Sequence, residues 1–144
     1  MTTNCFVCYD NLLKSPLLTS VTATSARTGY SVQNAYDWYT TSYWSPTASI
    51  DFHDITAIFS SAVSSDYFAV YRHNLKTVNC SIYLQYSTNS GSTWTTAASS
   101  TPTTDNELIL KTFASISATY WRVRVITLTD APLFIGVIIL KPLL

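Results

Sequence analysis

The segment Tyr120–Val125 alternates large apolar residues with arginines, and this alternation constrains the fold more than any other part of the chain. Successive side chains of a β-strand point to opposite faces. One face of this strand would therefore carry a tryptophan and two valines, and the other would carry Arg122 and Arg124. Residues 80–86 show the same period of two. Half-buried strands of this kind indicate an antiparallel sheet with one face against a core.

Similar short segments, rich in β-branched and aromatic residues and bounded by turn signals, recur from residue 19 onward. The strands that we expect are Ser20–Ser25, Ile55–Phe59, Ser65–His73, Cys80–Tyr86, Glu107–Phe113, Tyr120–Leu128 and Leu133–Leu140. No stretch of about ten residues keeps a helical period with suitable caps. The pattern predicts an all-β protein, an antiparallel β-sandwich with little helix.

The 144 residues suit one domain, with an extended N-terminal arm over residues 1–18 and the β-sandwich domain over residues 19–144. The arm is apolar but follows neither a period of two nor a helical stripe. It would be poorly placed in water, so we expect it to lie along its own sandwich or a neighbouring subunit. The arm residues expected to make assembly contacts are Cys5, Phe6, Val7, Tyr9, Leu12 and Leu13.

The charge content excludes some partners. Charged residues make up 11% of the chain and the formal net charge is zero, so no basic excess is present to bind nucleic acid. So little charge favours association, and we expect a homo-oligomer or another assembly. The longest apolar run, Leu133–Leu140, is far shorter than the ~20 residues of a membrane helix. The first residues do not resemble a signal peptide. We therefore expect the protein to be made and kept in a cytosol.

Neither a metal nor a cofactor is expected. Cys5 and Cys8 have the spacing of half a zinc site, but no histidine pair supplies the other ligands. Asp37, Asp51 and Asp54 could join carbonyl oxygens around calcium, and Asp37 is the weak candidate. Aspartates that cap turns are the preferred interpretation. The three cysteines are expected to be buried or interfacial thiols.

No constellation indicates an enzyme. The chain lacks a G-x-S-x-G elbow and a Walker loop, and it contains only three glycines. His73 and Asn74, at the end of an expected strand, are expected to satisfy backbone groups there. We therefore predict a protein without catalytic activity.

Aromatic residues are concentrated in a loop-like stretch. They are Tyr30, Tyr36, Trp38, Tyr39, Tyr43, Trp44 and Phe52. Such rings can stack on sugars or anchor protein interfaces. We expect Trp44 to plug one end of the sandwich, and Trp38 and Tyr39 to face a partner, with Tyr43 joining them if the partner is a glycan. Trp94 is expected to cover one end of the core.

Arg122 and Arg124 leave two interpretations open. The pair could bind carboxylates or phosphates with both forks of the guanidinium groups, or it could be the solvated or interfacial face of its strand.

Two sets of motifs carry a resemblance to known families, over about residues 19–141. Asn34-Ala35-x-Asp37, Thr41-x-x-Trp44 and Tyr120-Trp121-Arg122-Val123 resemble the discoidin or coagulation-factor type C domains, which are galactose-binding-like jelly rolls. The version of this fold in tailed-phage virion proteins is more similar still, on the residues Tyr67–Leu75, Leu84–Ser87, Gly91–Trp94, Tyr120–Val123 and Ile135–Ile138.

The resemblance implies a non-enzymatic structural protein of a phage virion, most simply a capsid decoration or cement protein. Its partners would be major capsid or tail proteins, and it would be made in the host cytoplasm and located in the virion. A tail accessory protein and a carbohydrate-binding module that recognises a receptor or host surface are the alternatives. The family's capacity to bind sugar or calcium would carry over to Asp37 and the loop around it.

Overall fold

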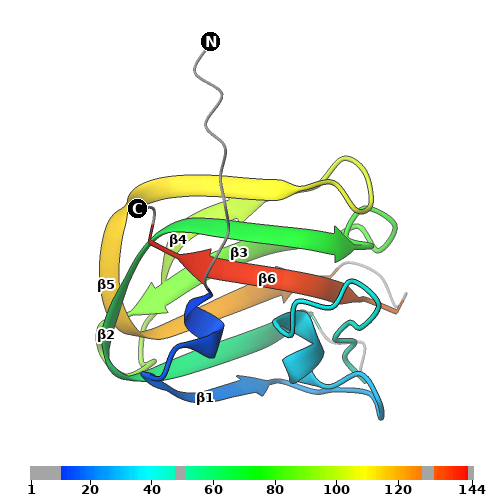
Figure 1. Ribbon diagram of the computed structural model, residues 1–144. Helices are drawn as coiled ribbons and strands as arrows, with labels where there is room; N and C mark the ends of the chain where they lie inside the picture. The colour runs from blue at the N-terminus through cyan, green and yellow to red at the C-terminus, as the bar shows by residue number, and fades with distance from the viewer. Residues whose placement is uncertain (1–10, 48–50, 128–131, 143–144) are drawn as a thin grey trace.

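The computed structural model describes residues 11–47, 51–127 and 132–142 (Figure 1). Its elements are the 3-10 turns η1 (Leu12–Lys14) and η2 (Val32–Ala35) and the strands β1 (Leu18–Ala23), β2 (Phe52–His73), β3 (Ser81–Ser87), β4 (Thr95–Ser100), β5 (Ile109–Ile126) and β6 (Ile135–Lys141). All strand pairs are antiparallel, which confirms the all-β prediction. In these ranges no helix is long and apolar enough to cross a bilayer.

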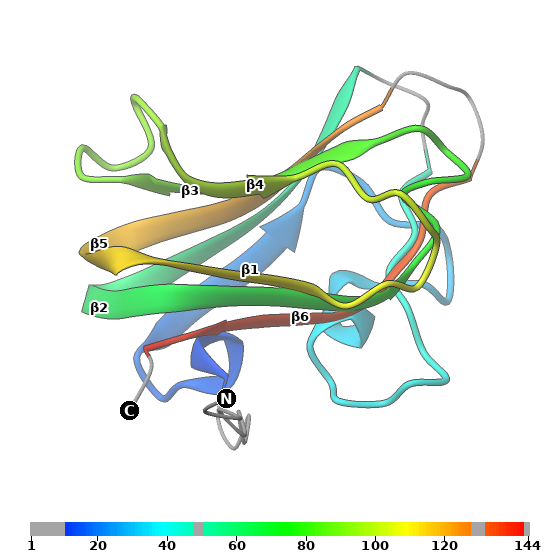
Figure 2. The same ribbon diagram turned by 90° about the horizontal axis from the view of Figure 1, so that it is seen from above.

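Two long strands, β2 and β5, bend and take part in both layers of a sandwich (Figures 1 and 2). The first half of β2 pairs with β1 and with the second half of β5, which also pairs with β3; β4 completes this layer beside β3. The second half of β2 pairs with β6 and with the first half of β5, and these three form the other layer.

The sequence predicted β2 and β5 as two strands each, and this was wrong. Both strands run on through segments of mostly small residues, 60–65 and 114–118, where the sequence pattern favours a turn. The register of the two strands shifts between Ile58 and Val63, so the ladder is interrupted there while the chain stays extended. Strand β4, a run of threonine, alanine and serine, was not predicted.

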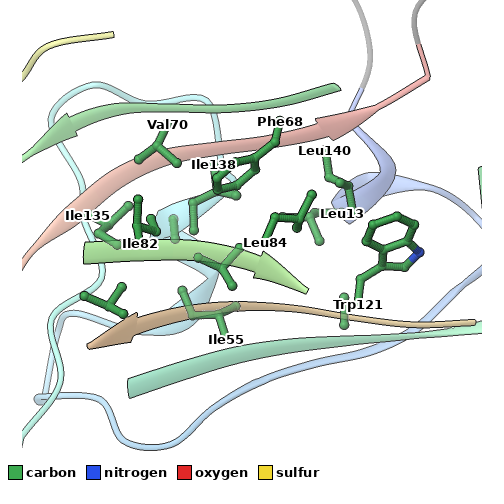
Figure 3. Close-up of a cluster of buried hydrophobic side chains, with 14 of the residues drawn as sticks. Leu13, Ile55, Phe68, Val70, Ile82, Leu84, Trp121, Ile135, Ile138 and Leu140 are labelled. Carbon is green, nitrogen blue, oxygen red and sulfur yellow. The ribbon is translucent and has the colours of Figure 1, made fainter. Parts of the chain in front are cut away.

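The core fills the space between the two layers (Figure 3). Side chains such as Ile55, Leu84 and Trp121 from one layer meet Phe68 and Ile138 from the other, and each is at most 3% exposed. The alternation predicted for the first segment is confirmed, because the tryptophan and both valines point inward while the arginines point outward. Burial of this apolar area is the main force that holds the layers together.

The chain enters the sandwich through Asn11 and Leu13. The Asn11 side chain donates to the carbonyl of Ile138 at 2.7 Å and accepts from the backbone N–H of Leu140 at 3.2 Å, so it binds the backbone of β6. Leu13 is 5% exposed and belongs to the core, and Leu12 packs against it. The other predicted arm contacts, Cys5, Phe6, Val7 and Tyr9, lie outside the described residues, and the boundary between arm and sandwich stays a prediction.

Candidate functional site

A long loop, residues 24–47, lies at the end of the sandwich where β6 begins (Figures 1 and 2). Trp44 anchors it: the ring is fully buried, and its Nε1 donates to the carbonyl of Ser25 at 3.0 Å. Trp44 also pairs with Ile135 at the start of β6, and Ser45 Oγ donates to the carbonyl of Leu133 at 2.7 Å. The prediction that Trp44 plugs the end of the sandwich is confirmed, and these bonds fasten the loop to the start of β6.

The tip of this loop presents two neighbouring aromatic residues to solvent. Trp38 is 38% exposed and Tyr39 is 67% exposed. Trp38 has a φ of 70°, a left-handed conformation that is strained for a bulky residue. Asp37 holds this geometry, because Oδ1 accepts from the Tyr39 N–H at 2.9 Å and Oδ2 accepts from Ser42 Oγ at 2.7 Å. The tip is therefore an ordered platform, which we call the aromatic tip (Trp38 and Tyr39).

Asp37 thus caps a turn, as the preferred sequence interpretation held. Both of its oxygens are used inside its own loop, while Asp54 binds arginines on a sheet face. Over residues 11–47, 51–127 and 132–142, no three acidic, histidine or cysteine side chains gather where they could hold a metal ion. Cys80 is a buried thiol beside β3.

Tyr43 occupies a different position from the aromatic tip. Its ring stacks on Tyr30 at 4.8 Å and lies 5.1 Å from Phe134, and the guanidinium of Arg72 lies 5.8 Å from the ring centroid. The pKa of Tyr43 is raised, chiefly by hydrogen bonding to Tyr30. This packing leaves Tyr43 half-buried as a support of the loop, whereas Tyr30 is 37% exposed.

The two histidines are structural. His73 Nε2 lies 2.9 Å from the carbonyl oxygen of Glu107, and the backbone N–H of Leu75 donates to its Nδ1 at 3.3 Å. Asn74 donates to the carbonyl of Pro132 at 2.7 Å. The predicted role of His73 and Asn74 as partners of backbone groups is confirmed. Burial lowers the pKa of His73 and of His53, which packs edge-on against Trp44.

Arg122 and Arg124 are on the outer face of β5, remote in sequence from the aromatic tip. Arg124 binds Asp54 through two bonds of 2.7 Å, and Arg122 lies 3.4 Å from the same carboxylate. Arg122 also lies 4.2 Å from the ring centroid of Trp94. Trp94 is thus half-buried on the outer face and is not a core residue, so the prediction that it covers an end of the core was wrong.

Sequence reasoning missed several partners in these surfaces. Phe134 meets Tyr43 because the loop is bridged to the start of β6, and Asp54 meets Arg124 because β2 and β5 pair in that register. The alternation of β5 was the one available signal for the sheet face. A pocket inside the sandwich is lined mainly by core side chains such as Leu13, and its apolar wall offers nothing to a polar ligand.

No protein-family model matches this chain, and a search of curated proteins finds no match either. Solved structures do match. Chitosan-binding module 1 from a chitosanase/glucanase of Paenibacillus sp. IK-5 is 23% identical, with a TM-score of 0.70 over 85% of this chain and 93% of the module. The module CpGH89CBM32-6, produced by Clostridium perfringens, is 16% identical, with a TM-score of 0.72 over 92% of this chain and 99% of the module.

A larger protein contains the same fold. The GH29 fucosidase of Ruminococcus gnavus, solved in complex with fucose, is 18% identical with a TM-score of 0.73 over 92% of this chain. This chain spans only 26% of that enzyme. At these sequence identities the similarity establishes the fold alone. The fold is an antiparallel, discoidin-like jelly-roll β-sandwich, as the sequence predicted. The two neighbours whose length this chain covers almost completely are carbohydrate-binding modules by name.

Proposed function

We propose that this protein is a carbohydrate-binding module that recognises its glycan through the aromatic tip. The observation that carries the proposal is the solvent exposure of Trp38 and Tyr39, consecutive residues of a loop in which Asp37 makes two internal hydrogen bonds. Ring faces stack on the C–H faces of sugars, and rigid rings bring large contact area at low entropic cost. The chitosan-binding name of one structural neighbour supports the ligand class.

The strained backbone of Trp38 supports the same conclusion. A φ of 70° at a bulky residue costs stability, and such strain is concentrated at ligand sites. Asp37 compensates for it with two hydrogen bonds to the tip. From the sequence, Trp38, Tyr39 and Tyr43 were all candidates for stacking on sugar rings. We now propose Trp38 and Tyr39 for this role and Tyr43 as a support of the loop.

Affinity electrophoresis against a panel of soluble polysaccharides, chitosan included, tests the proposal. Wild-type protein should be retarded by at least one polysaccharide, and the double variant Trp38→Ala/Tyr39→Ala should not be. Tyr71→Ala is the matched control, because Tyr71 is 47% exposed but lies on β2. Equal retardation of the wild type and the double variant would refute the aromatic tip as the site.

The virion role predicted from the sequence remains a separate proposal. The sequence resemblance alone supports this role. The similar solved structures named for this fold are a chitosan-binding module, a fucosidase and CpGH89CBM32-6, and none of them is a phage protein by name. A capsid decoration protein, a tail protein and a homo-oligomer in the particle are all compatible with a glycan-binding sandwich. Quantitative mass spectrometry of purified phage particles decides this point. Hundreds of copies of the protein per particle would indicate the head, and tens of copies would indicate the tail. If the protein is absent from the particles, the virion role is wrong.

A further inference from the structure

A second surface lies on the outer face of the layer formed by β1, β2, β5, β3 and β4, and it shares no residue with the aromatic tip. It carries a row of side chains that we call the arginine row. Its members, in order across the face, are Phe52, Arg124, Asp54, Arg122 and Trp94. Arg124 lies 4.1 Å from the ring centroid of Phe52, and Arg122 lies 4.2 Å from that of Trp94. An aromatic ring therefore holds each guanidinium group in place.

The charge of the arginine row is not balanced. Asp54 is the only carboxylate in the row and serves both guanidinium groups. Its bonds to Arg124 are short, 2.7 Å each, whereas its bond to Arg122 is 3.4 Å long. Two cations against one anion leave the row with a net charge of +1, on a chain whose formal net charge is zero. The excess positive charge lies nearer to Arg122.

Donors remain for a further anion. A guanidinium group has five N–H donors. Arg122 uses its Nε toward Gln85 at 2.7 Å and Nη1 toward Asp54, and Arg124 uses Nε and Nη2. The side chains of Arg122 and Arg124 are 13% and 24% exposed, so solvent reaches them. Burial lowers the pKa of Arg122 more than Asp54 raises it, which means that a second anion would stabilise this cation.

The residues that flank Arg122 on the neighbouring strands are polar. Arg122 pairs in register with Thr56 on one side and Gln85 on the other, and Gln85 Nε2 donates to Thr96 Oγ1 at 3.1 Å. Hydroxyl and amide groups beside a cation, on the outer face of a sheet, suit a ligand that carries hydroxyl groups and a carboxylate. Guanidinium groups recognise carboxylates through paired hydrogen bonds.

We propose that the arginine row is a second binding site, which takes the carboxylate of a uronic acid in an acidic polysaccharide. The class of ligand, a glycan, rests on the proposed function, whereas the preference for a carboxylate rests on the unbalanced arginines. The two sites consist of different residues, one set on a loop and the other on a sheet face, so each can be disrupted without the other.

Polygalacturonate is the probe, with neutral dextran as its uncharged counterpart, and calorimetric titration at low salt is the measurement. Arg122→Gln should weaken polygalacturonate binding about tenfold or more, since a charge-assisted hydrogen bond is lost. Lys76→Gln, which removes the same charge from an exposed position elsewhere, is the matched control and should leave the affinity within about twofold. Arg122→Lys, which keeps the charge but loses the fork, should show an intermediate loss.

The outcomes separate the two sites. Polygalacturonate binding that survives Trp38→Ala/Tyr39→Ala but is weakened by Arg122→Gln supports the arginine row. No binding of polygalacturonate by the wild type, or equal affinities for Arg122→Gln and Lys76→Gln, overturns it. An equal loss of dextran binding in Arg122→Gln also overturns it, because charge would then not be the basis of recognition. If Arg122→Gln does not fold, the comparison of Arg122→Lys with Lys76→Gln decides in the same way.

Discussion

The backbones of Trp44 and Ile135 exchange two hydrogen bonds, 2.9 and 3.0 Å long, across the end of the sandwich. This short antiparallel bridge fastens the loop that carries the aromatic tip to the first residue of β6. The Trp44 ring fills the space beneath the loop and leaves no part of itself exposed. The loop that carries the tip is therefore anchored by a residue that is itself fully buried.

Trp44→Ala should lower the free energy of unfolding by about 3–5 kcal/mol, because a buried ring is replaced by a cavity. Urea unfolding followed by circular dichroism measures the change. Trp38→Ala, at the exposed tip, is the matched control and should shift the free energy by only about 0.5 kcal/mol. Equal effects of the two substitutions would contradict the assignment of Trp44 as the anchor.

Trp38→Gly should be more stable than Trp38→Ala by about 0.5–1 kcal/mol. Glycine adopts a φ of 70° without the cost that a side chain incurs, although it loses more backbone entropy on folding. Both variants should lose glycan binding to the same extent, because both lack the ring. The two melting temperatures and one binding titration check this, and an alanine variant as stable as the glycine variant would argue against a strained tip.

Stability should decrease as the pH falls from about 7 toward 5. Burial depresses the pKa of His53 and His73 in the folded state, so the unfolded chain, with a histidine pKa of about 6.5, binds more protons in this range. The stabilisation is complete above the unfolded pKa and declines as the pH drops below it toward the lowered folded values. Urea unfolding at several pH values measures the slope.

The variant His73→Gln provides the control for that slope. It removes one of the two titrating groups, so its free energy of unfolding should depend less steeply on pH between about 7 and 5. A slope equal to that of the wild type would show that His73 does not contribute and that other groups cause the dependence.

Asn11→Ala should destabilise the protein by about 1–3 kcal/mol, because the backbone groups of Ile138 and Leu140 lose a buried partner. Gln33→Ala, an exposed position in η2, serves as the comparison and should be nearly neutral. Chemical denaturation of both variants measures the two changes in the free energy of unfolding. A neutral Asn11→Ala would mean that the edge of β6 does not need this side chain.

The strands whose two faces differ sharply could be predicted from the sequence. In β3, up to Leu84, and in the second half of β5, buried residues alternate with half-buried ones, as the period of two predicted. Strand β4 has no such contrast, since it lies at the end of the strand order and consists of small residues. The bends in β2 and β5 were missed because small polar residues there also suit turns, and only pairing with neighbours keeps the backbone extended.

The candidate sites divide in the same manner. The sequence predicted that Trp44 is buried and that Trp38 and Tyr39 are exposed. A long loop needs one apolar residue to anchor it to the core, and its other aromatic residues then remain in solvent. The position of Trp94 could not be predicted, because the partner that holds it, Arg122, is 28 residues away in the chain and reaches it only through the strand register. Contacts across strands are invisible until the pairing is known.

A glycan array probed in parallel with the wild-type protein and with Trp38→Ala/Tyr39→Ala shows whether the aromatic tip binds carbohydrate. The wild type should bind at least one group of related glycans, and the double variant should lose those signals while it keeps its melting temperature. An array on which the wild type binds nothing, or on which both proteins give the same signals, would contradict carbohydrate recognition by the aromatic tip.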